Sequence, residues 1–206
     1  MTNDRVATTL DVRSLAKSYA SREQTFEAIA DISFTVASGE FVCIVGPSGA
    51  GKTTLLKCLA GLLAPTSGEV LLEGEPVRSP PRQMGFVSQD YSRSLLPWLR
   101  VDKNVTFPLR HKGVDARRRA ELAEETLEVV GLAEFARHYP WQLSGGMQQR
   151  VAIARALAYQ PEILLMDEPF ASVDAQTRAD LEDLLLQVWA EYRVTVVFVT
   201  HDIDES

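Results

Sequence analysis

Residues 41–53 read Phe-Val-Cys-Ile-Val-Gly-Pro-Ser-Gly-Ala-Gly-Lys-Thr, and they carry the strongest indication of fold class in the sequence. Five apolar residues in a row, bounded by glycine, predict a β-strand that is buried on both faces. The residues that follow, Gly46–Thr53, match the pattern G-x-x-x-x-G-K-[ST], and a helix is expected from about Lys52 to Leu63. A strand, a glycine-rich loop and a helix in this order predict a cradle for phosphate groups.

The chemistry of this loop points to a nucleoside triphosphate. Glycines let the backbone curl so that successive N–H groups point at phosphates, beside the positive end of the helix dipole. Lys52 is expected to reach the β- and γ-phosphates, and the Thr53 hydroxyl is expected to ligate Mg²⁺.

A second stretch, Ile-Leu-Leu-Met-Asp-Glu at residues 163–168, predicts a buried strand that ends in two acids. Ligands lie at the carboxyl ends of strands in an open α/β sheet, so Asp167 and Glu168 are expected to face the nucleotide. Asp167 would hold Mg²⁺ through water, and Glu168 would orient or deprotonate the attacking water.

The composition limits the class of protein. The chain has 206 residues, of which 46% are hydrophobic, enough for one ordinary core. Its formal charge of −7 makes a nucleic-acid partner an unexpected one, since phosphate neutralisation needs clustered cations. No apolar run reaches the length of a membrane span, and the N-terminus has no signal-peptide pattern. Cys43 and Cys58 lie in apolar patterns and are expected to be free thiols, so a cytosolic protein is predicted.

The hydrophobic pattern predicts alternating strands and helices. Period-two alternation at Val6–Val12 and Ile32–Val36 indicates antiparallel strands. Continuous apolar strands at 163–166 and 194–199, with a helix at Asp180–Tyr192 between them, indicate a parallel α/β core.

The character is helical from about residue 91 to 143. Asp115 is a plausible N-cap and Gly131 a plausible stop for one helix, and Gly146–Tyr159 forms a second. We therefore predict a nucleotide-binding core with an antiparallel β lobe at 1–90 and 151–206, and a helical subdomain at 91–150.

The run Leu-Ser-Gly-Gly-Met-Gln-Gln-Arg at 143–150 resembles the signature motif of ATP-binding-cassette (ABC) ATPases. With the phosphate loop and Asp167-Glu168, the resemblance extends from about Leu10 to the last residue. It implies an α/β P-loop NTPase (RecA-like) core with an N-terminal antiparallel β subdomain and an inserted helical subdomain. Family members continue for tens of residues past the position of His201, so a C-terminally truncated cassette is expected.

The resemblance also implies roles for single residues. Two chains would sandwich two ATP molecules, each signature motif contacting the nucleotide of the opposite chain. Gln89 matches the family's Q-loop glutamine, and His201 matches the switch histidine. Ser172-Val173-Asp174 matches the D-loop, with Val173 where most relatives have Leu. The expected catalytic residues are Lys52, Gln89, Glu168 and His201, and the expected metal ligands are Thr53, Gln89 and Asp167.

An aromatic ring is expected to stack on adenine. Tyr19 matches the family position, and Phe26 is an alternative because residues 21–25 lengthen the intervening loop. The expected nucleotide contacts are Tyr19, Gly46, Pro47, Ser48, Gly49, Ala50, Gly51, Lys52, Thr53 and Thr54, and from the opposite chain Ser144, Gly145 and Gly146.

Three further stretches look like importers of the nitrate, sulfonate and taurine group: 95–98, 101–105 and 139–143. The predicted function is thus the ATP-hydrolysing subunit of such an importer, peripheral on the cytoplasmic side of the cell membrane. Its partners would be a second copy of itself, transmembrane permease subunits and, indirectly, a solute-binding protein. Leu95, Leu96 and Trp98 would form a groove for a short permease helix, or would pack between the two lobes.

Alternatives from other classes stay open at this point. One is a soluble ABC-type ATPase that is not coupled to transport, and another is a truncated cassette that binds ATP without turnover. A P-loop kinase or GTPase would lack the run at 143–150.

Overall fold

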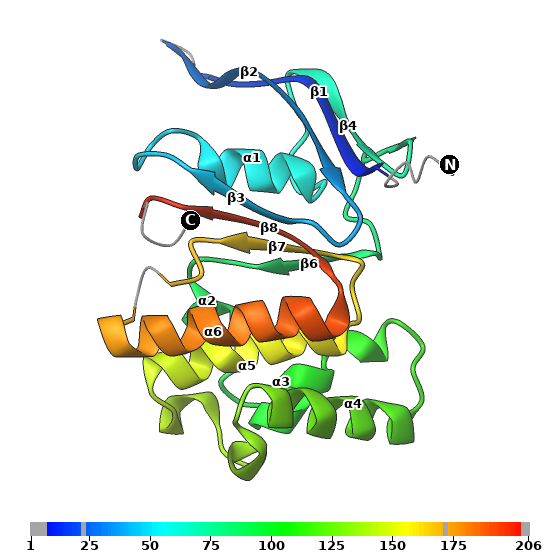
Figure 1. Ribbon diagram of the computed structural model, residues 1–206, viewed down its shortest axis with the longest axis vertical. Coiled ribbons are helices and arrows are strands. Elements are labelled where there is room, and N and C mark those ends of the chain that lie inside the picture. Colours follow the sequence, from blue (N-terminus) through cyan, green and yellow to red (C-terminus); the bar gives the residue numbers. More distant parts are fainter. Residues whose placement is uncertain (1–7, 22–23, 171–172, 203–206) are drawn as a thin grey trace, which may run out of the picture.

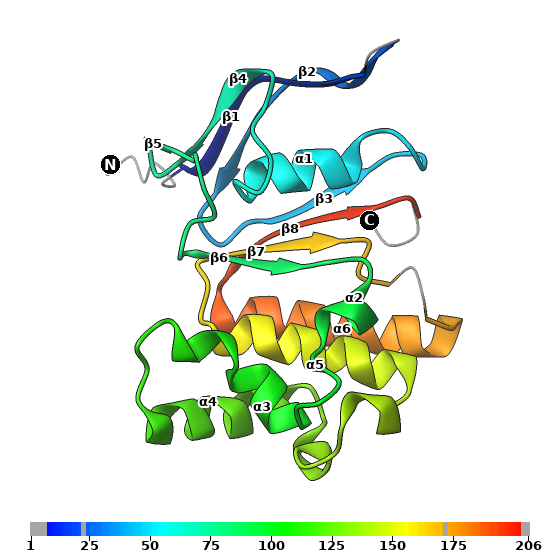
Figure 2. The ribbon, with the colours of Figure 1, turned by 180° about the vertical axis from the view of Figure 1, so that it is seen from behind.

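The computed structural model describes residues 8–21, 24–170 and 173–202, which form a mixed α/β fold in layers (Figures 1 and 2). An antiparallel sheet lies on one side of helix α1, and a parallel sheet lies on the other. The antiparallel sheet has the order β2 (Thr25–Ala37), β1 (Thr8–Ala20), β4 (Ser67–Leu72), β5 (Glu75–Pro76). The parallel sheet has the order β3 (Phe41–Val45), β8 (Thr195–Thr200), β7 (Ile163–Asp167), β6 (Met84–Val87).

Helices cover both faces of the parallel sheet. Helix α1 (Lys52–Leu59) fills the space between the two sheets, while α5 (Gly145–Ala158) and α6 (Ala175–Tyr192) cover the opposite face. Of the remaining helices, the first lies next to the end of β6, and the others lie beyond α5 in a helical part of the chain. They are α2 (Tyr91–Ser94), α3 (Val101–Thr106), η1 (Pro108–Arg110), α4 (Ala116–Val129), η2 (Ala133–Phe135) and η3 (Pro140–Gln142).

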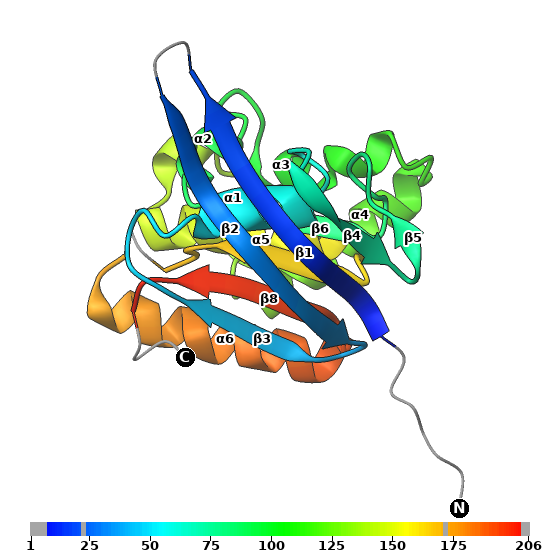
Figure 3. The ribbon, with the colours of Figure 1, turned by 90° about the horizontal axis from the view of Figure 1, so that it is seen from above.

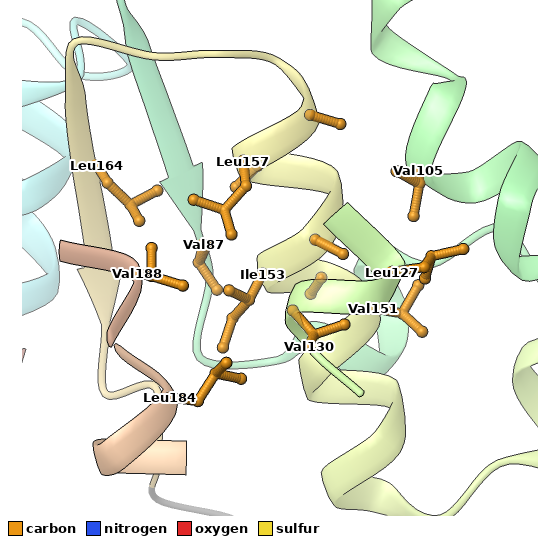
Figure 4. Packing of buried hydrophobic residues seen from close by; sticks show 14 of the residues in the cluster. Val87, Val105, Leu127, Val130, Val151, Ile153, Leu157, Leu164, Leu184 and Val188 are labelled. Carbon is orange, nitrogen blue, oxygen red and sulfur yellow. The ribbon is translucent and has the colours of Figure 1, made fainter. Parts of the chain in front are cut away.

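Two hydrophobic clusters hold these layers together, and the central strands feed both. Ile163 and Leu165 of β7 pack with α1, whereas Leu164 of the same strand packs with Ile153 and Val188 from α5 and α6 (Figure 4). Side chains alternate across a strand, so a continuous apolar run supplies both cores at once. The predicted buried parallel strands at 163–166 and 194–199 are confirmed.

The strand at residues 41–45 departs from the prediction. It lies at the edge of the parallel sheet, pairs with β8, and is only partly buried. A continuous apolar run indicates that both faces of a strand pack against other elements, but it does not distinguish a central strand from an edge strand. The helix that follows is also shorter than expected: it ends at Leu59, and Gly61 then adopts φ = 67°.

Other element bounds differ from the predicted ones for local reasons. The hairpin strands β1 and β2 are longer than the alternation indicated, because register shifts in the β1–β2 pairing break the period of two. Helix α6 begins at Ala175, five residues before the predicted start, because the Asp174 carboxylate caps it by accepting from Thr177 N.

The helical part begins and ends its longest helix as predicted. Asp115 accepts from the backbone N–H groups of Arg117 and Arg118, and Gly131 adopts φ = 70° after the last turn. The domain division at residues 90 and 150 stays a prediction. Within the described ranges, no helix combines the length and the apolar character that crossing a membrane requires.

Asn104 is the polar centre of the turn that joins α2 to α3. It is fully buried, and its Oδ1 accepts from Leu96 N at 2.7 Å. Its Nδ2 donates to the carbonyl oxygens of Leu96, Leu99 and Arg100 at 2.9–3.2 Å. One amide thereby satisfies a loop that would otherwise leave backbone groups without partners in the interior.

We expect Asn104→Leu to lower the free energy of unfolding by about 2–4 kcal/mol, because several buried backbone groups lose their partner together. Urea unfolding measures this. Lys103→Ala removes a half-exposed neighbour that pairs with Asp102 at the surface, and it serves as the matched control. Equal urea midpoints for the two variants would contradict the role given to Asn104.

Candidate nucleotide site

Three strand ends meet at one edge of the parallel sheet. Val45 lies opposite Thr200 in the β3–β8 ladder, and Asp167 lies opposite Val199 in the β7–β8 ladder. Gly46 N donates to Thr200 O at 3.2 Å, which fixes the start of the glycine-rich loop. The glycine-rich loop after β3 and the chain segments after β7 and β8 therefore leave the sheet at the same edge (Figure 2).

The glycine-rich loop at residues 46–51 has the backbone that the motif requires. Gly49 and Gly51 adopt φ of 84° and 85°, a left-handed region that side chains disfavour. A Cβ at Gly51 would also overlap the carbonyl oxygen of Ala28 in β2. The loop, which also contains Pro47, Ser48 and Ala50, leads directly into α1. The first N–H groups of α1 have no acceptor within the helix. This arrangement fits an anion.

Lys52 and Glu168 form a buried ion pair at the mouth of this loop. The ammonium Nζ of Lys52 lies 3.3 Å from Glu168 Oε1 and donates to the carbonyl oxygens of Gly46 and Pro47 at 2.7 and 3.0 Å. Both side chains are largely removed from solvent.

Two more of the predicted residues converge on the same carboxylate. Gln89 Nε2 donates to Glu168 Oε2 at 2.9 Å, and His201 Nδ1 lies 3.3 Å from that oxygen. The Glu168 backbone has φ = 45°, unusual for a residue with a side chain, and its N–H donates to Val199 O at 2.9 Å. The four residues expected to be catalytic thus lie in direct contact.

Thr53 and Asp167 supply oxygen atoms for a divalent cation. Thr53 Oγ1 donates to Asp167 Oδ1 at 2.9 Å, and the carboxylate is buried. Burial raises the pKa of Asp167, and the hydrogen bond from Thr53 opposes that rise. A partly buried hydroxyl and a buried carboxylate beside an anion cradle are the hard ligands that Mg²⁺ prefers, so these residues fit the ion. Gln89, the third expected ligand, contacts Glu168 instead.

The two candidate base-stacking rings lie on the β1–β2 hairpin. Tyr19 is opposite Phe26 in the ladder, and its hydroxyl lies 3.3 Å from Thr54 Oγ1 at the start of α1. Both rings are exposed, Tyr19 at 43% and Phe26 at 62%. Geometry therefore keeps both candidates near the phosphate loop.

The signature residues lie away from this cluster. Ser144 caps α5 and accepts from Met147 N at 3.3 Å, and Gly145 and Gly146 begin the helix. The parallel sheet separates this helix from the phosphate loop of the same chain (Figure 1). A Cβ at Gly146 would overlap Thr177 Cγ2, so the start of α5 touches the first turn of α6.

An ion pair that is not predicted from the sequence holds the loop after β8. Arg178 Nη1 lies 2.8 Å from Asp202 Oδ2, and Asp202 N donates to Thr200 Oγ1. The pair ties the residue after His201 to the first turn of α6. The position of Asp202 directly after the expected histidine was the only signal for it. Ser172 of the expected D-loop lies outside the described residues.

The expected groove at residues 95–98 is divided by the structure. Leu95 is buried in the hydrophobic cluster with α5, which agrees with the packing alternative for this residue and not with an open groove. Trp98 is 70% exposed, as is Trp141, which stacks on Tyr139 at a ring-centroid distance of 6.0 Å. The sequence of this short run does not indicate which of its apolar side chains face solvent.

Comparison with known proteins places the chain among transporter cassettes. A family model described as ABC transporter matches residues 29–171. An uncharacterised ABC transporter ATP-binding protein of Methanocaldococcus jannaschii is 50% identical over 98% of this chain and 75% of its own length. A nitrate import ATP-binding protein of Synechocystis is 42% identical, over 96% of this chain and 73% of that protein. An aliphatic sulfonates import ATP-binding protein of Bacillus cereus is 41% identical, with coverages of 96% and 77%.

A solved structure agrees with the sequence comparison. It is a dimeric ATP-binding cassette in a post-hydrolysis state bound to ADP and Pi. It matches with a TM-score of 0.84 and 38% identity, over 95% of this chain and 89% of that one. The predicted fold class of an ABC cassette is confirmed. The chain belongs to the ABC transporter family, as one of its ATP-binding cassettes, which are ATPases.

Proposed function

We propose that this chain is the ATP-binding and ATP-hydrolysing subunit of an importer for nitrate, a sulfonate, taurine or a related small solute. The observation that carries the ATPase part is the convergence of Lys52, Gln89 and His201 on the Glu168 carboxylate at the end of β7. The nitrate and aliphatic sulfonates import ATP-binding proteins among the relatives support the transport part.

The residues of the cluster then have separate tasks. Lys52, already held by the carbonyl oxygens of Gly46 and Pro47, would bind the terminal phosphates in place of its contact with Glu168. Glu168, released from that contact, would accept the proton of the attacking water. Gln89 and His201 would hold the carboxylate and water in line.

Thr53 and Asp167 would hold Mg²⁺, with Gln89 as a further ligand. When bound, the ion would neutralise charge on the phosphates. The buried Asp167 carboxylate is costly to ionise alone, as its raised pKa indicates, and a cation would offset that cost.

The signature motif would act on the ATP of a second copy. Ser144 is a helix N-cap with neighbouring N–H groups, a site suited to phosphate oxygens, yet it lies across the sheet from its own phosphate loop. The related cassette of known structure is dimeric, which supports this arrangement. Transmembrane permease subunits, an indirect solute-binding protein and a peripheral position on the cytoplasmic side of the membrane belong to the same proposal.

The alternatives have less support. A soluble ABC-type ATPase without a transport partner is not favoured, because two of the three relatives named above are import ATP-binding proteins and the third is a transporter ATP-binding protein. A cassette that binds ATP without turnover is an outcome of the first test below.

Glu168→Gln is expected to keep ATP binding and to lower turnover by about 10²–10⁴-fold, because an amide cannot take up the proton. Lys52→Ala is expected to lose binding as well. Glu162→Gln, which neutralises an exposed acid directly before β7, is the matched control. Phosphate release measures turnover, and fluorescent-nucleotide titration measures binding. Wild-type turnover in Glu168→Gln would refute the role of Glu168 as base, and no turnover in the wild-type chain would favour binding alone.

A mixing experiment tests the opposite-chain role of Ser144. Lys52→Ala and Ser144→Arg are each expected to be inactive. In a mixed dimer, one shared site receives both substitutions and the other receives neither. Random pairing makes about half of the dimers mixed, so roughly a quarter of all sites are intact. Nucleotide trapping that scores single sites should show this recovery.

Two controls make the result decisive. Cross-linking establishes that mixed dimers form. A chain with both substitutions, mixed with the wild-type chain, gives mixed dimers that contain no intact site. If the first mixture traps no more nucleotide than its separate variants, Ser144 serves its own chain.

A further inference from the structure

The β1–β2 hairpin places two aromatic rings next to each other. Tyr19 and Phe26 are direct partners in the antiparallel ladder, so their side chains project from the same face. The Cβ atoms of such partners lie about 4.5–5.5 Å apart. The sequence offers the two rings as alternatives, whereas this register makes them neighbours on one surface.

That surface lies beside the phosphate loop. The Tyr19 hydroxyl contacts Thr54 Oγ1 in the first turn of α1. Strand β2 is the edge strand of its sheet, and its backbone at Ala28 passes close to Gly51. A Cβ atom at Gly51 would overlap the carbonyl oxygen of Ala28. Phe26 is two residues from Ala28, and the hairpin extends over α1 toward the loop (Figure 3).

The two rings differ in how much of their surface is engaged. Lys17 donates to Ala64 O at 2.7 Å and holds its ammonium 5.5 Å from the centroid of the Tyr19 ring. Tyr19 is therefore held at its hydroxyl by Thr54 and at its ring by a cation. Phe26 is 62% exposed, although a strand face usually packs a large apolar ring. Its exposed ring is the larger free aromatic surface at this position.

We propose that Phe26 is a second base-stacking residue, which with Tyr19 forms a two-ring platform that favours a purine nucleotide. This inference rests on the proposed function, because it assumes that a nucleoside triphosphate occupies the phosphate loop. Stacking scales with the overlap of flat surfaces, so a bicyclic purine can cover both rings where a pyrimidine covers one. Phe26 touches the base only and has no part in binding phosphates.

Binding measurements with and without a base test this assignment. The probes are ATP, CTP and inorganic tripolyphosphate, titrated against the whole chain by calorimetry. Phe26→Leu keeps an apolar side chain without a π-face, and we expect it to weaken ATP binding about tenfold. It should leave tripolyphosphate binding unchanged and reduce the preference for ATP over CTP. Phe26→Trp should restore both.

Controls separate this inference from the proposed function. Phe107→Leu removes an exposed ring in the helical part and should change no binding constant. Tyr19→Leu reports the first ring alone. If Phe26→Leu binds ATP within twofold of the wild type while Tyr19→Leu is weakened, Phe26 is not a stacking residue and the proposed function stands. If the wild-type chain binds neither ATP nor tripolyphosphate, both proposals are wrong.

Discussion

The register of the parallel sheet is the constraint on which the site depends. The main-chain ladders of β8 with β3 and β7 set Val45 opposite Thr200 and Asp167 opposite Val199, with neighbouring strands about 4.8 Å apart. A slip of one residue in either ladder would turn Asp167 away from Thr53 and part Glu168 from Lys52. The two hydrophobic clusters that flank β7 resist such a slip, because it would exchange their side chains. The strand register that packs the hydrophobic core is thus also the register that brings the site residues together.

The residues of the motifs could be predicted from the sequence because their chemistry requires particular residue types. Gly51 permits a left-handed backbone against Ala28. Lys52 and Thr53 begin the helix after one apolar strand, and Asp167 and Glu168 lie at the end of another, so the motif and the strand end together predicted one cluster. Contacts between residues that are not neighbours in the sequence and belong to no motif could not be predicted. The four hydrogen bonds of Asn104 and the pair Arg178–Asp202 depend on how loops fold back, and neither has a local pattern.

Glu168 is restrained by opposing demands. Its backbone is in the left-handed region, and its carboxylate is shared by Lys52, Gln89 and His201. A residue at such a strained conformation persists only when its surroundings determine it. Here the N–H bond to Val199 and the three side-chain partners do so, and the proposed function takes one of those partners, Lys52, for the phosphates. In the proposed function, Glu168 would therefore exchange one side-chain partner while its backbone bond to Val199 stays in place.

The contact between Gly146 and Thr177 has a consequence for how this chain can vary. The space beside Thr177 Cγ2 has no room for a Cβ at position 146, and α6 begins there under the Asp174 cap. Helices packed this closely share a fixed volume, so a larger residue at one position requires a smaller one at the other. Among homologous cassettes, positions 146 and 177 should therefore change together or not at all. Covariation between the two positions would therefore report the distance between α5 and α6 from sequences alone.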